Sequence, residues 1–480
     1  MRVLATVCVV GLALGALAAG AAAARTPPGF DVFDCVMRVS RAGPMLETCY
    51  AAARGDAAGA HKFGRALMQG DGMTRDLPMA VALLRRAAEA GLPAAALDLA
   101  RAHQRGLGVP RDVEEAARWF RRAATDDYPR GKFELAVFLD GTRIADGEVV
   151  DLMRQAYRAA RAKVAGEDVD ALYVVGAIRT NDEYAPPYQF NPEDGMKLLR
   201  RAAQRGDVEA ASRLGVALVE ARRSDARATE DPLPWFRQAA ARGEPVACLM
   251  LARMSGAGGA RASADSARAR LLYHCAAEQG IAVAMHELAD HYLSGDGSDG
   301  ALTDVAAARQ WYFRAFEAGY EHAAGPAGAM AAAGRGGPRD EAAAVAVLQR
   351  MIELKIFDAA DLRNLAAALA EHPETGRGAL EVARAAVEEA GKRRDAYLWV
   401  PALAWIHFRL GDGAKAEAML RAGLARFGGA DNMDLRRTLG DVLHGLGRVA
   451  EARAEWQRAL RGIEGTLGGL PLQRRLDLTK

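Results

Sequence analysis

Two histidines in one predicted helix are the first residues whose spacing could do chemistry. They stand in His286-Glu-Leu-Ala-Asp-His291, which at first sight resembles the helix of a zinc protease. That chemistry needs histidines at positions i and i+4, on one face of the helix. Here the second histidine is at i+5, which rotates the two imidazoles away from each other. We therefore predict no metal site in this helix.

A glycine-rich stretch, Gly295-Asp-Gly-Ser-Asp-Gly300, could offer two carboxylates to a calcium ion. It lacks the acidic residue that closes a calcium-binding loop, so a turn between helices explains it better. No nucleophile elbow, phosphate-binding loop or dinucleotide fingerprint stands between a predicted strand and a helix. The sequence therefore predicts no catalytic residue, no metal and no cofactor.

The cysteines are the remaining reactive side chains. Cys8 lies in an apolar N-terminal run, which leaves Cys35, Cys49, Cys248 and Cys275. In an oxidising compartment this even number is compatible with two disulfides, one within each successive pair, and buried thiols are the alternative. No cysteine belongs to a CxxC motif, so redox catalysis and zinc binding are not expected.

Residues 1–24 have the features of a secretion signal. A positive start at Arg2 precedes an uncharged run from Val3 to Ala24, which ends in small residues suited to cleavage. An uncleaved anchor is the alternative. No lipidation cysteine follows the run. We predict an exported, periplasmic bacterial protein whose mature chain has no transmembrane span.

The charge balance argues against a nucleic-acid partner. The 480 residues contain 63 lysines and arginines against 61 aspartates and glutamates, a formal net charge of +2. Such a chain has no strong overall field to attract a polyanion. Aromatic residues are only 6% of the chain, which fits thin, alanine-lined helix contacts better than a bulky enzyme core.

A pair of alanines recurs along the chain at nearly constant spacing. It stands at positions 87/88, 123/124, 159/160, 202/203, 239/240 and 276/277, and as Ala315-Phe316 in the next copy. Eight residues after most of these pairs comes a small residue of the next helix, such as Ala96. Leucine or alanine then follows three residues later and glycine or alanine four residues later, which places these side chains on one helical face. This period is typical of helix–turn–helix units that bury a core only by stacking on one another.

The best-preserved unit, residues 96–124, carries the elements that point to a family. It contains the turn Gly106-Leu-Gly108, then Asp112, then Trp119-Phe-Arg-Arg-Ala-Ala124. These elements resemble the Sel1-like repeat family, a relative of the tetratricopeptide repeat, over residues 56–357. Residues 358–462, in which Leu410-Gly411 returns as Leu446-Gly447, resemble ordinary tetratricopeptide repeats. Residues 25–55 are predicted to form an N-terminal cap and residues 463–480 a C-terminal tail.

This resemblance implies an all-α, right-handed superhelical solenoid that binds proteins on a concave face lined by the first helices. The side chains expected to contact a partner are those outside the stacking positions of the first helices. The candidates are Lys62, Arg65, Gln69, Arg101 and Gln104.

The residue before each alanine pair is mostly arginine, as at Arg86, Arg122 and Arg158. In a stacked solenoid these side chains would form a ladder along one surface. The ladder is either a docking track for an acidic partner or anionic polymer, or a set of arginines that are solvated or paired with neighbouring carboxylates.

The function that we expect is that of a non-enzymatic scaffold or adaptor that assembles unidentified proteins of the cell envelope. One alternative implied by the resemblance is a structural component of an alginate-like exopolysaccharide secretion complex. The other is a cell-wall-active hydrolase of the cysteine-rich Sel1 branch.

Overall fold

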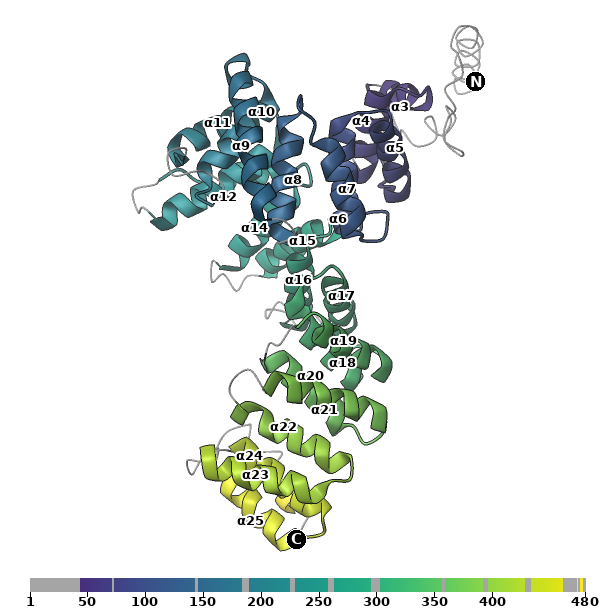
Figure 1. Cartoon of the computed structure of the whole chain (residues 1–480), viewed down its shortest axis with the longest axis vertical. Coiled ribbons are helices and arrows are strands. Elements are labelled where there is room, and N and C mark those ends of the chain that lie inside the picture. The colour runs from purple at the N-terminus through teal and green to yellow at the C-terminus, as the bar shows by residue number, and fades with distance from the viewer. Residues whose placement is uncertain are drawn as a thin grey trace. The chain divides into compact units, whose positions relative to one another are not determined.

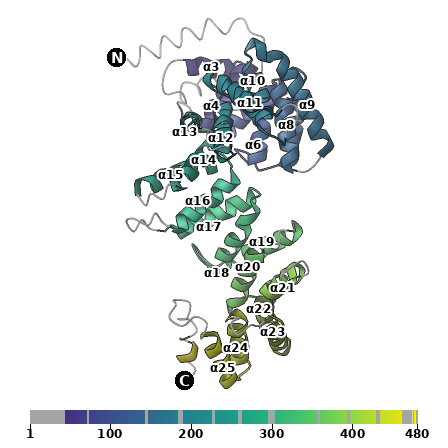
Figure 2. The same ribbon diagram turned by 90° about the vertical axis from the view of Figure 1, so that its left-hand side faces the viewer.

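The structure is a computed structural model of the chain (Figure 1). It describes residues 44–460, 473 and 475–477, except for 71–72, 143–145, 184–189, 225–228, 258–262, 295–302, 356–358, 392–395 and 428–432. Every regular element in these ranges is a helix. The fold is an all-α solenoid of helix pairs, as the sequence predicts (Figures 1 and 2).

The chain forms two compact units, residues 1–247 and 248–480. In the N-terminal unit the even-numbered helices are the first members of their pairs. Its helices are α3 (Pro44–Ala53), α4 (Ala57–Gln69), α5 (Leu77–Glu89), α6 (Pro93–Arg105), α7 (Val113–Ala123), α8 (Pro129–Thr142), α9 (Asp146–Lys163), η1 (Val164–Gly166), α10 (Val169–Thr180), α11 (Pro192–Gln204), α12 (Val208–Ser224) and α13 (Leu233–Ala240).

The C-terminal unit begins at Cys248, within α14 (Pro245–Ala257). It continues with α15 (Ser263–Glu278), α16 (Ala282–Ser294), α17 (Val305–Glu317), η2 (Glu321–Ala323), α18 (Ala324–Ala333), α19 (Glu341–Glu353), α20 (Ala359–Glu371), α21 (Arg377–Gly391), α22 (Ala396–Arg409), α23 (Gly413–Phe427), α24 (Met433–Gly445) and α25 (Val449–Leu460).

Aspartates fix where many of these helices begin. Asp76 accepts a hydrogen bond from the N–H of Met79 at 3.1 Å, and Asp112 accepts one from the N–H of Glu115 at 2.9 Å. Such a cap satisfies an N–H that has no partner within its own helix, and it contributes about 1 kcal/mol. Asp112, which follows the predicted turn, is therefore the N-cap of α7, and Asp76 is the N-cap of α5.

The turn glycines fix the spacing between neighbouring repeats. Gly106 and Gly108 have φ angles of 71° and 72°, a conformation that favours glycine. A Cβ atom on Gly108 would lie 2.5 Å from the carbonyl oxygen of Leu77, at the start of α5. The turn of one repeat therefore packs directly on the backbone of the preceding repeat.

The repeated alanines and aromatic residues form the core of the N-terminal unit. Leu99, Phe120 and Ala123 are buried in one continuous cluster, and the ring of Phe120 stacks on Phe138 of the next pair with centroids 4.7 Å apart. Within the residues that the structure describes, no helix has both the length and the apolar character that a membrane span requires.

Candidate partner-binding site

The N-terminal unit contains a cavity of about 950 Å³ among its first helices. This volume is at the upper end of the range of about 300–1,000 Å³ that is usual for ligand sites. Its lining comes from Met45 of α3, from α4 and α6, from the N-terminal ends of α8, α10 and α12, and from the turns at 205–207 and 241–243.

Helix α4 turns three polar side chains toward this cavity. Its buried face contains Phe63 and Leu67, which pack into the core. Lys62, Arg65 and Gln69 lie three and four residues apart, which places them together on another face of the helix. All three line the cavity.

Arg130, near the start of α8, is the most heavily paired side chain at the cavity. It is only 9% exposed. Its guanidinium lies 2.7 Å from Asp170, 2.6 Å from Asp207 and 2.5 Å from Glu209. Burial alone would lower the pKa of Arg130, but these carboxylates outweigh it and the pKa is raised. The arginine therefore stays charged and joins α8 to α10 and α12.

Arg101 on α6 makes the longest-range contact in this region. Its two terminal nitrogens donate to the two oxygens of Glu209 on α12 at 2.6 and 2.9 Å, across 108 residues of sequence. It also lies 3.2 Å from Glu134 on α8. Such a bidentate pair is among the stronger kinds of charged hydrogen bond. The cavity is therefore bridged from the second repeat to the fifth.

Glu209 is the shared member of these pairs. Burial alone would raise the pKa of Glu209, but Arg101 and Arg130 lower it well below the usual range for glutamate. Asp98 is similar, because burial opposes ionisation there, whereas a hydrogen bond from His61 and the charge of Arg65 lower its pKa. Both carboxylates are ionised at neutral pH.

Aromatic contacts extend the network into the core. The guanidinium of Arg130 lies 4.1 Å from the centre of the Tyr173 ring. The hydroxyl of Tyr173 donates to Glu134 at 2.9 Å and accepts from Arg213 at 2.8 Å. The desolvated position of Tyr173 raises the pKa of this phenol. The tyrosine is therefore a neutral hydrogen-bonding link between the two charged groups.

The structure places four of the five first-helix candidates at this cavity. They are Lys62, Arg65, Gln69 and Arg101, whereas Gln104 is not among the lining residues. Arg101 is committed to the carboxylates described above. The partner-binding role of all five residues stays a prediction.

The arginine ladder contacts the preceding repeat. Arg86 donates to the carbonyl oxygen of Ala52, and Arg122 donates to that of Glu89 at 3.2 Å. Arg122 also lies 5.2 Å from the centre of the Trp119 ring. Arg158 is exposed on α9. At Arg86 and Arg122 this arrangement favours pairing between repeats, and docking of a partner on the ladder stays a prediction.

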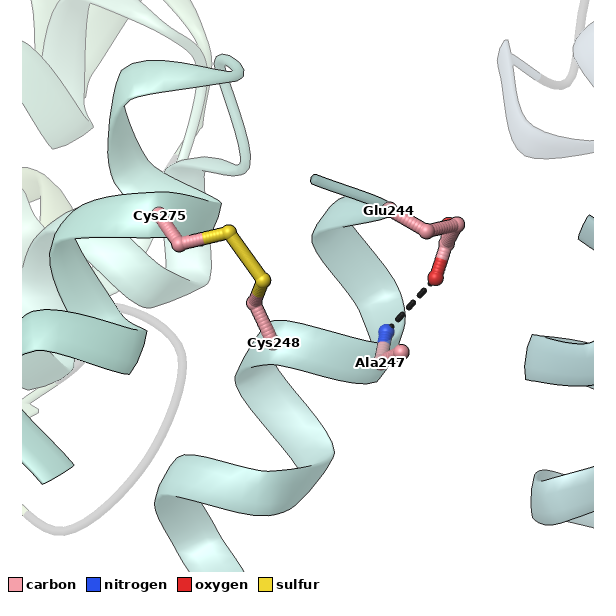
Figure 3. Close-up of a disulfide and its surroundings, with 4 residues drawn as sticks. All are labelled: Glu244, Ala247, Cys248 and Cys275. Carbon is pink, nitrogen blue, oxygen red and sulfur yellow. Dashed lines mark hydrogen bonds between the residues drawn. A yellow bond between two sulfur atoms is a disulfide. The ribbon is translucent and has the colours of Figure 1, made fainter. Parts of the chain in front are cut away.

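Cys275 occupies the ladder position of its repeat, and the structure joins it to Cys248 in a disulfide (Figure 3). The bond links α14 to α15, with Cα atoms 6.0 Å apart. Cys49 is buried in α3. Cys35 lies outside the described residues, so the pairing of Cys35 with Cys49 stays a prediction.

The two histidines of α16 contact different groups. His286 lies 3.3 Å from Asp290, and its ring packs on Tyr312 and Tyr320. The ring of His291 packs on Tyr273. In the described part of the chain, no group of three or more His, Cys, Asp or Glu side chains is placed to hold a metal ion. The loop Gly295–Gly300 lies outside the described residues.

The acidic half of the charged network was not predicted from the sequence. A signal was present, because Asp168-Val-Asp170-Ala and Asp207-Val-Glu209-Ala repeat the same pattern at the starts of α10 and α12. In each copy the first aspartate caps the helix, and the second acidic residue reaches Arg130.

Stacked helix pairs with periodic glycine turns define this chain as a helical repeat solenoid. Five segments match the Sel1 repeat, residues 57–92, 93–128, 169–207, 245–281 and 282–320. The chain therefore contains five Sel1 repeats.

Solved structures of solenoid proteins are similar to this chain. One is c5321, a protective antigen of uropathogenic Escherichia coli with an SLR fold (21% identity, 91% of this chain and 90% of that chain covered, TM-score 0.44). Another is a Sel1 repeat protein from Oxalobacter formigenes (25% identity, 72% and 96% covered, TM-score 0.36). Yeast Tom70 is more distant (10% identity, 88% and 95% covered, TM-score 0.30). No curated protein matches the chain.

Proposed function

We propose that this protein is an exported, periplasmic and non-enzymatic scaffold that binds and assembles other proteins. The observation that carries the proposal is the cavity of the N-terminal unit, with Lys62, Arg65 and Gln69 exposed along one helix. Solenoid repeats use such concave surfaces to bind other proteins.

Site-specific photo-crosslinking in living cells tests the binding role. A photo-reactive residue replaces Gln69, which lines the cavity, and in a separate strain it replaces Arg118, whose side chain is 69% exposed on α7. We expect discrete crosslinked proteins from position 69 and few from position 118. Equal crosslinking at both positions, or none at position 69, would contradict the proposal.

Export is tested on the same cells. Fractionation should place the protein in the periplasm, and its N-terminal sequence should begin at Arg25 after removal of residues 1–24. Retention of the intact N-terminus in the membrane fraction would favour the uncleaved anchor. Recovery in the cytoplasm would contradict export.

A further inference from the structure

We propose that the cavity of the N-terminal unit binds an acidic segment of a partner protein, one that carries aliphatic side chains between its carboxylates. This rests on the proposed scaffold function, because it names the kind of segment that the scaffold captures.

The carboxylates that line the cavity already form ion pairs with arginines of the protein itself. Six lysines and arginines line the cavity together with four carboxylates. Each of the four carboxylates pairs with a buried or half-buried arginine of the network. They are Asp98 with Arg101, and Asp170, Asp207 and Glu209 with Arg130.

The positive charges that remain are available to a ligand. The exposed side chains of Lys62 and Arg242 form no ion pair with any residue in the described part of the chain. Arg65 is 49% exposed, and its nearest carboxylate, Asp98, lies at 3.6 Å and contacts His61 more closely, at 2.8 Å. The cavity therefore has a surplus of cationic groups that the fold leaves without a strong partner.

This surplus is local. The whole chain has a formal net charge of only +2, so a polyanion gains little from the rest of the surface. Within a recess the attraction between opposite charges is stronger than on an exposed surface, because less water screens it. Carboxylates of a bound segment would form charge-assisted hydrogen bonds with Lys62, Arg65 and Arg242.

Apolar side chains in the same lining favour a peptide over an anionic polysaccharide. Met45, Val169 and Val208, each partly exposed, lie among the charged residues of the cavity. A uronate polymer offers carboxylates but no aliphatic side chains to cover these residues. A protein segment that mixes glutamate with leucine or valine matches both kinds of lining, and burial of its aliphatic groups adds to affinity.

The test measures binding of a fluorescein-labelled octapeptide of glutamate and leucine to the full chain by fluorescence anisotropy. An octapeptide of lysine and leucine and an oligogalacturonate are the comparison ligands. The cavity variant is Lys62→Glu with Arg242→Glu. The matched control is Arg118→Glu with Lys197→Glu, which changes the net charge equally at two side chains exposed by 69% and 64%.

We expect the acidic peptide to bind, with a Kd that rises at least about tenfold in the cavity variant and less than about twofold in the control. Circular dichroism should show the same helix content in all chains. If the charge reversal unfolds the protein, Lys62→Gln with Arg242→Gln replaces it and should still weaken binding.

Three results would overturn the proposal: no binding of the acidic peptide, equal weakening in both double variants, or tighter binding of oligogalacturonate with the same dependence on Lys62 and Arg242. Crosslinks from position 69 alongside any of these results would leave the scaffold function standing and reject only the acidic segment. Binding of the acidic peptide without such crosslinks would support the cavity as a site for acidic peptides and contradict the scaffold function.

Discussion

Two sets of arginines in the N-terminal unit hold the repeats together over different distances. Arg86 and Arg122 on second helices reach back 34 and 33 residues, to the carbonyl oxygens of the preceding repeat. Arg101 and Arg130 on first helices reach 108 and 79 residues forward to Glu209. The first set fixes the contact between neighbours, whereas the second fixes how the stack closes around the cavity.

The two sets of arginines also differ in how much their contacts contribute to the stability of the folded protein. The ladder arginines donate to backbone carbonyl oxygens that water could also reach. Each of these hydrogen bonds therefore adds little to the free energy of unfolding. The first-helix arginines are buried or half-buried against several carboxylates, and removal of one charge leaves the others uncompensated. We therefore expect the two sets to differ clearly in mutational cost.

The largest effect is expected for Arg130→Met. It leaves Asp170, Asp207 and Glu209 without their shared cation, which should cost about 3–5 kcal/mol. Urea unfolding with a hydrogen-exchange readout on peptides from α8 and α12 measures this in the full chain. Arg118→Met, on the exposed surface of α7, is the control and should cost less than about 0.5 kcal/mol. A loss below about 1 kcal/mol in Arg130→Met would remove the distinction between the two sets.

The disulfide is expected to rank second. The bond between Cys248 and Cys275 spans 27 residues, and a loop of this size stabilises the folded state by about 3 kcal/mol. The variant Cys248→Ser with Cys275→Ser should lose that amount in exchange peptides from α15. Peptide mapping without reductant should recover the two cysteines in one linked species. Alkylation of both as free thiols in protein that has not been exposed to reductant would contradict this prediction.

The pH dependence of stability follows from Glu209. Arg101 and Arg130 lower its pKa in the folded state, so the unfolded chain takes up a proton first as the pH falls. The contribution of Glu209 is complete above about pH 4.3, the pKa of an unperturbed glutamate, and is lost as the pH falls from there toward the folded-state pKa. The free energy of unfolding should therefore fall less steeply below about pH 4.3 in Glu209→Gln than in the original protein. Equal slopes would show that Glu209 is not held ionised by these arginines.

The smallest effect is expected in the ladder. Arg122→Met removes one hydrogen bond at 3.2 Å and a contact with Trp119, which should cost about 0.5–1 kcal/mol. Exchange in α5 and α7 measures the loss. If Arg122→Met costs as much as Arg130→Met, the ladder is a main support of the solenoid.

The periodic features of this chain could be predicted from its sequence. The alanine pairs, the Asp112 cap and the Gly108 turn belong to a pattern that recurs because each repeat makes the same contact with its neighbour. The same register predicts that Lys62, Arg65 and Gln69 are available to a partner, because they fall outside the stacking positions of α4. Local spacing was sufficient for all of these.

The charged network could not be predicted in the same way. Whether Arg101 meets Glu209 depends on how far the stack turns over three repeats, and small changes in each helix-pair angle add up over that distance. Arg130 also lies in residues 129–168, which fall between two of the matched Sel1 segments. The acidic pattern at the starts of α10 and α12 marks one half of the network, but nothing in the sequence locates its partners.

A double-mutant cycle on Arg101 and Glu209 tests most directly whether the N-terminal repeats are joined across the cavity. The single variants Arg101→Met and Glu209→Gln and their combination are compared by urea unfolding of the full chain, with exchange in α6 and α12 as the readout. The structure predicts a coupling energy of at least about 1 kcal/mol between residues that are 108 positions apart. Additive losses, with coupling below about 0.3 kcal/mol, would contradict the contact and the bridge that it makes across the cavity.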